Sequence, residues 1–220
     1  ILQSVKELRS LAQTLKDPYH TELHIGAFPT LSPYIFPKVM ADFKDAYPNM
    51  KFFLVEEKTE NLIDSLLAGR IDIALIALPF SDDSLECEFL FKEDFYLGVS
   101  QKNPLSTESS VPVSQLKEEK LLLLDEGHCL RDQALEYCHR NKLSEDYDFR
   151  GSSLETLRQM VLIDVGVTLF PKCSLREDGL SYLSFDGKAP MREVALFWRK
   201  TSFKKDIILE VVDDFKRVLL

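Results

Sequence analysis

The segment AGRIDIALIAL, residues 68–78, decides the fold of this 220-residue chain. Gly69 is a helix-stop residue, and the apolar run 71–78 that follows it is typical of a strand buried on both faces. Working outward from this segment, helix-like and strand-like patterns alternate; we expect strands over 22–28 and 51–56 and helices over 32–46 and 60–68. This βαβαβ order predicts a mainly parallel sheet with helices on both faces.

The second half of the chain repeats the alternation. We expect strands over 94–100, 121–124, 167–170 and 193–199, and helices over 130–140, 153–163 and 203–219. Two similar halves predict an α/β fold of two Rossmann-like lobes with a cleft between them. The first lobe is expected to comprise residues 19–91 plus 200–220, and the second lobe residues 92–199.

Composition and charge narrow the class of protein. The chain is 45% hydrophobic, which excludes a disordered segment, and no apolar run reaches the roughly 18 residues needed to cross a bilayer. Its net charge is −9, with 27 basic and 36 acidic residues, so it is not expected to grip DNA by itself. Because it begins at Ile1 with no signal-like segment, we interpret it as a piece of a longer cytoplasmic protein.

Residues 1–18 carry apolar side chains at a spacing of about 3.5 residues, which predicts a helix with a narrow apolar stripe that ends at Pro18. Such a helix either packs on its own domain or forms a linker between two copies of the chain. The pattern does not decide between the two.

Three hydroxyl side chains precede expected helices. Thr30 (or Ser32), Thr59 and Ser153 stand at these positions, and Ser153 begins a capping-box pattern. A hydroxyl beside free backbone N–H groups at the carboxyl end of a strand suits a small polar ligand. The same residues cap helices in the absence of any ligand, and the two roles are compatible.

The segment DEGHCLRDQALEYCH, residues 125–139, carries the most chemistry. Cys129 falls at or just before the start of an amphipathic helix, where the helix dipole favours a thiolate, although neighbouring acidic residues oppose this. Cys138 follows Cys129 by nine positions, which is about 13 Å of rise on a continuous helix. A disulfide requires Cα atoms within about 7 Å, so oxidation of this pair would have to unwind the helix.

Other interpretations of the cysteines remain open at this point. Buried cysteines in cytosolic proteins commonly act as small hydrophobes, which is what we expect of Cys87 and Cys173. The pairs 128–129 and 138–139 could supply four metal ligands, but their spacing matches no usual zinc pattern. A hydrolytic cysteine would need a positioned base, and only His128 is evident.

The whole chain resembles the regulatory domains of the OxyR-type hydrogen-peroxide sensors, which are LysR-type transcription regulators. The strongest match is the core EGHCLRDQA, residues 126–134, with a second cysteine at the matching interval. Residues 153–158 (SLETLR) and the pair Pro29-Thr30 match as well. The chain departs from the pattern at 163–166 (IDVG), and Cys173 is an additional thiol.

This resemblance implies a periplasmic-binding-protein-like fold of type 2 and a redox mechanism. Cys129 would be the peroxidatic thiol, oxidised to a sulfenic acid, and Cys138 the resolving thiol. The implied peroxide pocket consists of Thr30, Thr59 and His128, and the implied supporting residues are Gly127, Arg131, Asp132 and Ser153. No metal and no cofactor are implied, and the protein would not be an enzyme.

The resemblance also implies partners. They are hydrogen peroxide, a second or further copies in a homodimer or homotetramer, promoter DNA bound through a winged helix-turn-helix domain before residue 1, RNA polymerase, and a thiol reductant such as glutaredoxin or thioredoxin. Three competing hypotheses are a LysR-type domain for a small organic effector held in the cleft, a thiol peroxidase, and a solute-binding protein. Treating the reduced protein with a stoichiometric amount of hydrogen peroxide and mapping its thiols by mass spectrometry distinguishes a redox sensor from a domain for an organic effector.

Overall fold

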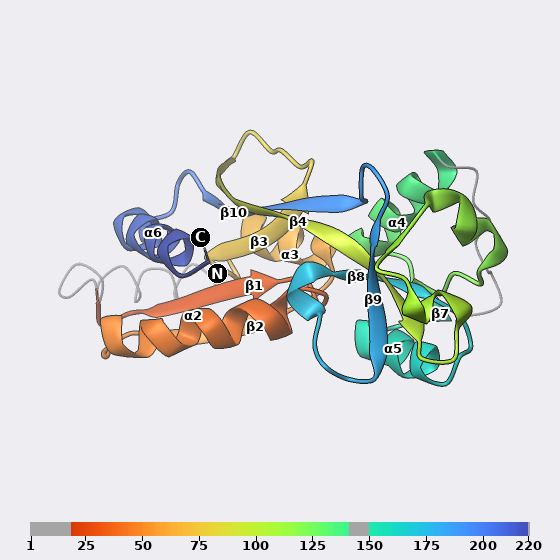
Figure 1. Ribbon diagram of the computed structural model, residues 1–220. Helices are drawn as coiled ribbons and strands as arrows, with labels where there is room; N and C mark the ends of the chain where they lie inside the picture. Colours follow the sequence, from red (N-terminus) through yellow and green to blue (C-terminus); the bar gives the residue numbers. More distant parts are fainter. Residues whose placement is uncertain (1–18, 141–149, 220) are drawn as a thin grey trace. The chain divides into compact units, whose positions relative to one another are not determined.

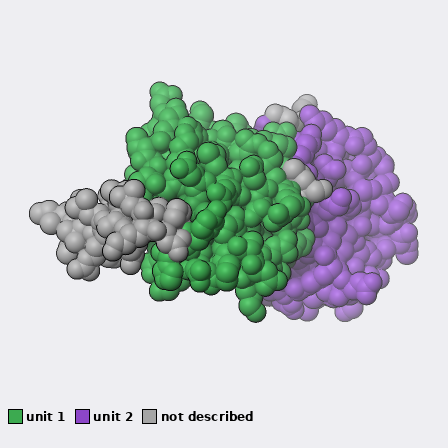
Figure 2. All heavy atoms as spheres, turned by 90° about the vertical axis from the view of Figure 1, so that its left-hand side faces the viewer, with its two compact units in different colours: residues 1–28, 32–91, 193–220 green, residues 29–31, 92–192 purple. Residues whose placement is uncertain are grey.

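The computed structural model describes residues 19–140 and 150–219, with the backbone alone for residues 137–140. The predicted helix over 1–18 therefore lies outside the described residues. The described chain forms two compact units (Figure 1; Figure 2, green and purple). The first contains residues 19–28, 32–91 and 193–219, and the second contains residues 29–31 and 92–192.

The first unit is a sheet covered by amphipathic helices. Its strands lie in the order β2 (Lys51–Glu56), β1 (Glu22–Ala27), β3 (Ile73–Leu78) and β10 (Met191–Arg199). The helices are α2 (Ser32–Ala46), α3 (Thr59–Leu67) and α6 (Lys205–Leu219). Helix α6 buries Ile207, Ile208, Val211, Val212 and Phe215, the three-to-four-residue spacing of one helix face. Phe215 meets Phe43 of α2 edge-on, with ring centroids 5.3 Å apart.

One expectation for this unit needs correction. Strand β1 pairs in parallel with β2 and β3, as the βαβαβ order predicts, and β10 joins β3 in antiparallel register. The same pairing places residues 193–199 in the first unit, whereas the sequence analysis assigned them to the second lobe. Residues 29–31, by contrast, group with the second unit.

The second unit contains a mostly antiparallel sheet and a small separate ladder. Strand β4 (Leu85–Ser100) pairs in antiparallel register with β8 (Thr168–Pro171) and with β9 (Leu180–Phe185), and β5 (Ser110–Val111) lies parallel to β9. Within the predicted strand 121–124, Leu121 forms an isolated parallel bridge with Val167, and β6 (Leu123–Leu124) pairs in parallel with β7 (Arg150–Gly151). The helices are α4 (Cys129–Arg140) and α5 (Leu154–Leu162), with short 3-10 helices at Pro104–Thr107, Val113–Glu118 and Lys172–Ser174.

Helix α5 ends at a residue with left-handed backbone. Asp164 has φ of 67°, a conformation that glycine adopts most readily. The backbone N–H of Val165 bonds the carbonyl of Met160 at 3.1 Å, and the Ser100 hydroxyl donates to the Asp164 carboxylate at 2.6 Å. The departure from the family pattern at 163–166 therefore forms the carboxyl end of α5.

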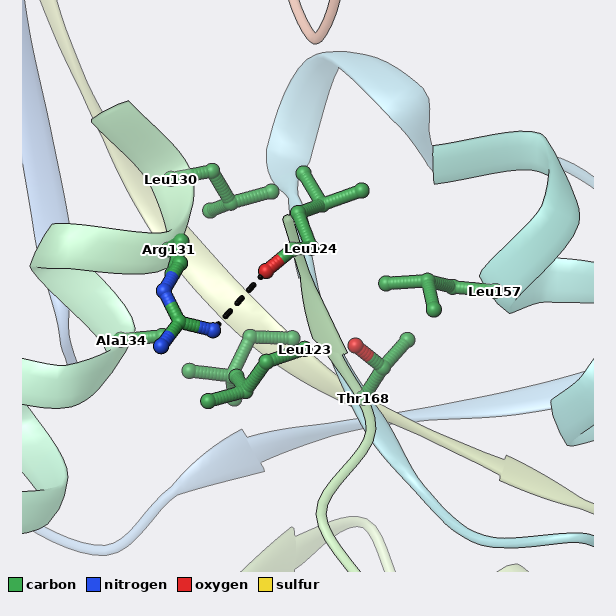
Figure 3. A pocket seen from close by; sticks show the side chains of 8 residues that line it. Leu123, Leu124, Leu130, Arg131, Ala134, Leu157 and Thr168 are labelled. Atoms are coloured by element: carbon green, nitrogen blue, oxygen red, sulfur yellow. Dashed lines mark hydrogen bonds between the residues drawn. The ribbon is translucent and has the colours of Figure 1, made fainter. Parts of the chain in front are cut away.

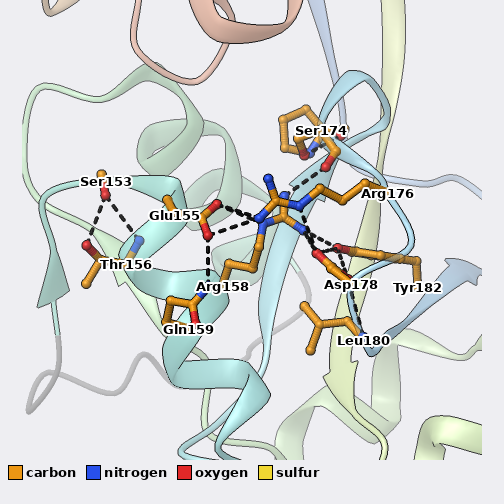
Figure 4. A network of polar contacts seen from close by, with 11 residues as sticks. Ser153, Glu155, Thr156, Arg158, Gln159, Ser174, Arg176, Asp178, Leu180 and Tyr182 are labelled. Carbon is orange, nitrogen blue, oxygen red and sulfur yellow. Dashed lines mark hydrogen bonds and ion pairs between the residues drawn. The ribbon is translucent and has the colours of Figure 1, made fainter.

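A fully buried arginine ties α5 to the rest of the second unit (Figure 4). The guanidinium of Arg158 donates to the Asp178 carboxylate, to the Tyr182 hydroxyl and, at 2.8 Å, to the Ser174 carbonyl. The Cζ atom of Arg158 also lies 4.5 Å from the centre of the Phe170 ring. Arg158 is four residues after buried Leu154 and three before buried Val161, so it occupies the apolar face of its helix.

A buried ion pair holds the sheet of the first unit to the start of α6. The Lys204 ammonium lies 2.9 Å from the Asp72 carboxylate and 2.6 Å from the Glu22 carbonyl. Burial by itself would raise the pKa of Asp72, but hydrogen bonds from His24 and the charge of Lys204 lower it below its usual value. No helix in the described ranges is long and apolar enough to cross a membrane.

The lowered pKa of Asp72 makes stability depend on pH. Its contribution is fully present above about pH 5 and is lost as the pH falls below about 4 toward the lowered pKa, because the unfolded chain then binds more protons. Asp72→Asn should lower the free energy of unfolding at pH 7 by about 3 kcal/mol, since Lys204 keeps an uncompensated buried charge. It should also flatten the decline below pH 5 in urea denaturation curves. The exposed Asp42→Asn serves as the control, and equal effects of the two changes would contradict this account.

Candidate redox site

The predicted reactive cysteine is the first residue of a helix. Gly127 has φ of +82° and turns the chain, after which the carbonyl of His128 accepts hydrogen bonds from the backbone N–H groups of Arg131 at 2.9 Å and Asp132 at 3.4 Å. Cys129 is the first residue of α4, as predicted, and it is partly buried. His128 is buried and Asp132 is exposed. The structure thus brings Gly127, His128 and Cys129 together at one helix start, where the helix dipole favours negative charge.

Arg131 anchors the first turn of α4 (Figure 3). Its side chain is buried, and its guanidinium donates to the carbonyl of Leu124 in β6 at 3.1 Å. Beneath this turn lies a cavity of about 10 Å³ between α4, β6, α5 and β8. The cavity is lined by Leu123, Leu124, Leu130, Arg131, Ala134, Leu157, Thr168 and Leu169.

The ladder beneath α4 is short. Strands β6 and β7 contribute two residues each. The backbone N–H of Asp125 extends the ladder by donating to the Gly151 carbonyl at 2.9 Å, and Glu126 forms a 3.6 Å ion pair with Arg150. The segment that leads into β6 is also joined to the main sheet, because Leu121 bridges to Val167 and the backbone N–H of Leu122 donates to the Val167 carbonyl at 2.8 Å.

Cys138 belongs to the same helix as Cys129. Helix α4 is continuous from Cys129 to Arg140, so the two positions are about 13 Å apart along its axis. The side chain of Cys138 lies outside the described part. The backbone alone, however, places the two cysteines too far apart for a disulfide while the helix is intact.

Thr30 lies in the second unit, in a buried polar cluster that the sequence analysis missed. The guanidinium of Arg192 donates to the Thr30 hydroxyl at 2.9 Å and to the Thr30 carbonyl at 3.1 Å. Glu93 neutralises Arg192, with one carboxylate oxygen 2.6 Å from the guanidinium, and its other oxygen accepts the backbone N–H of Cys173 at 2.9 Å. Thr30, Glu93 and Arg192 are all buried.

Neither predicted cap near the start of the first unit's helices is observed. The hydroxyl of Thr30 is engaged by Arg192, and that of Ser32 donates to Glu56. Thr59 is the first residue of α3, and the N-cap is Lys58, without a side-chain cap. The Thr59 hydroxyl oxygen is buried with no hydrogen-bond partner. Thr59 belongs to the first unit, so its place relative to Thr30, His128 and Cys129 is not described.

Ser153 does cap its helix. Its hydroxyl accepts the backbone N–H of Thr156 at 3.1 Å, as predicted for the start of α5 (Figure 4). Glu155 does not complete a capping box, because its carboxylate pairs with Arg176 at 2.9 Å. Ser153 therefore fixes the start of the helix that packs beside the cavity under α4.

The remaining thiols differ in environment. Cys87, expected to be a buried hydrophobe, is exposed on β4. Cys173 lies within the Arg192–Glu93 cluster, and burial raises the pKa of its thiol to about 12 although Arg192 opposes the shift. Among the residues whose side chains are described, no group of three or more His, Cys, Asp or Glu could hold a metal ion. The side chains of Cys138 and His139, which the metal interpretation needs, lie outside that part.

Comparison with protein families gives the class. Residues 16–219 match the LysR substrate binding domain, so the chain belongs to this family of regulatory domains, and the resemblance seen in the sequence is confirmed. A hydrogen peroxide-inducible genes activator of Haemophilus influenzae is 35% identical over 228 residues, covering all of this chain and 75% of the relative.

Solved structures of similar fold carry OxyR in their names. The reduced OxyR regulatory domain of Pseudomonas aeruginosa superposes with a TM-score of 0.82 at 32% identity, covering 90% of this chain and 98% of that one. An oxidised form of OxyR superposes with a TM-score of 0.80 at 32% identity, covering 90% and 95%. The mixed α/β fold is thus the type 2 periplasmic-binding-protein-like fold that was expected.

The thiols of Cys87 and Cys173 should react at very different rates with an alkylating reagent. At pH 8, iodoacetamide should modify Cys87 at least about 100-fold faster than Cys173, because the Cys173 thiol is partly buried and its pKa is raised to about 12, so it stays protonated. Quenched samples digested and analysed by mass spectrometry give both rates. In urea the two rates should converge. Comparable rates in the native protein would refute the assigned burial of Cys173.

Proposed function

We propose that the chain is the redox-sensing regulatory domain of a LysR-type transcription regulator, switched by hydrogen peroxide at Cys129. The observation that carries this proposal is a cysteine at the first turn of α4, in a chain whose relatives are named as peroxide-inducible activators. A low-pKa, accessible thiol is the group that peroxide oxidises most readily.

The chemistry has two balanced steps. The Cys129 thiolate attacks one oxygen of hydrogen peroxide, an S–O bond forms as the O–O bond breaks, and the leaving hydroxide takes up a proton to become water. The Cys138 thiolate then attacks the sulfenic sulfur, forming the disulfide and releasing a second hydroxide, which also becomes water. Sulfur loses two electrons overall and the peroxide gains them. Thr30, Thr59 and His128 form the proposed peroxide pocket, with Gly127, Arg131, Asp132 and Ser153 in support.

Formation of the disulfide requires α4 to open. The helix keeps the two positions about 13 Å apart, whereas the bond needs Cα atoms within about 7 Å. The Arg131 contact to Leu124 and the short β6–β7 ladder hold the closed arrangement. Rebuilding of residues 128–139 is the local order change that passes the signal on.

The proposed oligomeric state, location and partners follow from the class of LysR-type regulators. The domain is proposed to act as a homodimer or homotetramer in the cytoplasm, with promoter DNA bound through a winged helix-turn-helix domain that precedes it. RNA polymerase and a thiol reductant such as glutaredoxin or thioredoxin are the other proposed partners. The two lobes are proposed to be the two compact units, residues 19–28, 32–91 and 193–219 for the first and residues 29–31 and 92–192 for the second. A domain for a small organic effector is less favoured, since the relatives are named for peroxide.

One equivalent of hydrogen peroxide should link Cys129 to Cys138 in the reduced protein. Peptide mapping by mass spectrometry detects the link, and circular dichroism should show a loss of helix as α4 opens. Cys138→Ser should instead hold Cys129 as a sulfenic acid that dimedone traps. Cys87→Ser is the control and should form the disulfide like the wild type. An unreacted Cys129, or a Cys138→Ser variant with unchanged products, would overturn the proposal.

A further inference from the structure

The buried cluster around Thr30 fixes the direction of the hydrogen bonds that the Thr30 hydroxyl makes. A hydroxyl has one proton to give and lone pairs that accept, whereas a guanidinium only donates. Arg192 donates to the Thr30 hydroxyl at 2.9 Å and holds the Thr30 carbonyl at 3.1 Å. The Thr30 proton must therefore point away from Arg192. Within the described ranges, no hydrogen bond satisfies that proton.

Glu93 determines where Arg192 stands. One carboxylate oxygen accepts from the Arg192 Nε at 2.7 Å and lies 2.6 Å from Nη2. The other accepts the backbone N–H of Cys173 at 2.9 Å. Both oxygens are thus engaged, and the carboxylate has no freedom to turn. A buried carboxylate fixed at both oxygens orients the guanidinium in turn.

We propose that Glu93 is a positioning residue for the peroxide reaction: by holding Arg192 against Thr30, it makes the Thr30 hydroxyl a fixed hydrogen-bond donor to the oxygen that leaves the peroxide. This inference rests on the proposed function, which places Thr30 in the peroxide pocket. It adds a residue that contacts neither the thiol nor the peroxide.

The donor acts where charge develops. As the Cys129 sulfur bonds to one peroxide oxygen, the other oxygen departs with the electron pair of the O–O bond and becomes basic. A donor already oriented toward that oxygen stabilises it without reorganisation. The benefit is largest for a basic leaving group such as hydroxide. It is small for peracetic acid, whose leaving group is acetate.

The test measures the rate of Cys129 oxidation in a Cys138→Ser background by quenched flow and mass spectrometry, with hydrogen peroxide and with peracetic acid. Thr30→Val and Glu93→Gln should each slow the reaction with hydrogen peroxide by about 10-fold or more, and that with peracetic acid by less than about threefold. Thr30→Ser keeps the hydroxyl and should restore most of the rate that Thr30→Val loses. Exposed Glu118→Gln in the same unit is the matched control.

A double variant shows whether Glu93 acts through Thr30. Glu93→Gln combined with Thr30→Val should be no slower than Thr30→Val alone, because the second change has nothing left to position. Three results would each overturn the proposal. They are a double variant whose loss of rate is the product of the two single losses, a variant slowed equally with hydrogen peroxide and peracetic acid, and a Glu93→Gln variant that reacts with hydrogen peroxide as fast as the unchanged protein.

Folding is controlled separately. Glu93→Gln leaves Arg192 charged and buried, so thermal unfolding is measured for every variant. If Glu93→Gln does not fold, the double variant Glu93→Gln, Arg192→Met removes both charges. It should also slow the reaction of Cys129 with hydrogen peroxide, and an unchanged rate in that variant would overturn the proposal. A wild-type protein whose Cys129 does not react at all would refute the proposed function itself, which is a different result.

Discussion

The rise of an intact helix is the constraint on which the second unit's proposed role depends. Helix α4 is continuous from Cys129 to Arg140, and a rise of 1.5 Å per residue keeps positions 129 and 138 about 13 Å apart. Sequence spacing and helical geometry are enough to make the closed helix and the disulfide mutually exclusive. What the fold adds is the means of holding the helix closed: the Arg131 bond to Leu124, apolar contact at Leu130 and Ala134, and a ladder two residues long.

Two buried arginines organise the surroundings of that helix. Arg158 donates to the carbonyl of Ser174, and Arg192 pairs with Glu93, which accepts the backbone N–H of Cys173. Both cations therefore meet the same short 3-10 helix, Lys172–Ser174. A buried charge without a partner costs several kcal/mol, so each arginine fixes its acidic partner and the backbone beside it. The second unit is thus held together at the 3-10 helix Lys172–Ser174 by two buried cations.

Much of this architecture could be predicted from periodicity. Helix α2 and strand β2 have the predicted bounds, and Gly69 precedes a buried strand. Pairing direction was less accessible, because a strand such as β10 looks the same in sequence whether its neighbour is parallel or antiparallel. Thr59 shows a second limit: a hydroxyl before a helix indicates a cap, but the actual start of α3 shifts by one residue and leaves it within the helix.

The candidate site was predicted where the signal is local and missed where it is not. The position of Cys129 follows from the glycine turn and the helix pattern around it. The cluster of Thr30, Glu93 and Arg192 joins residues up to 162 positions apart, and no spacing rule connects them. Arg158 could have been found, because it falls on the apolar face between Leu154 and Val161. An arginine at a core position of an amphipathic helix predicts a buried acidic partner.

The short ladder beneath α4 also has a kinetic consequence. In the proposed chemistry, a sulfenic acid on Cys129 waits until the helix opens, and its lifetime is set by the free energy of that local unfolding. During the wait a second peroxide molecule competes with Cys138, and its attack produces a sulfinic acid that thiols do not reduce. A lower free energy of opening shortens the wait. The stability of α4 therefore sets the highest peroxide concentration at which the switch remains reversible.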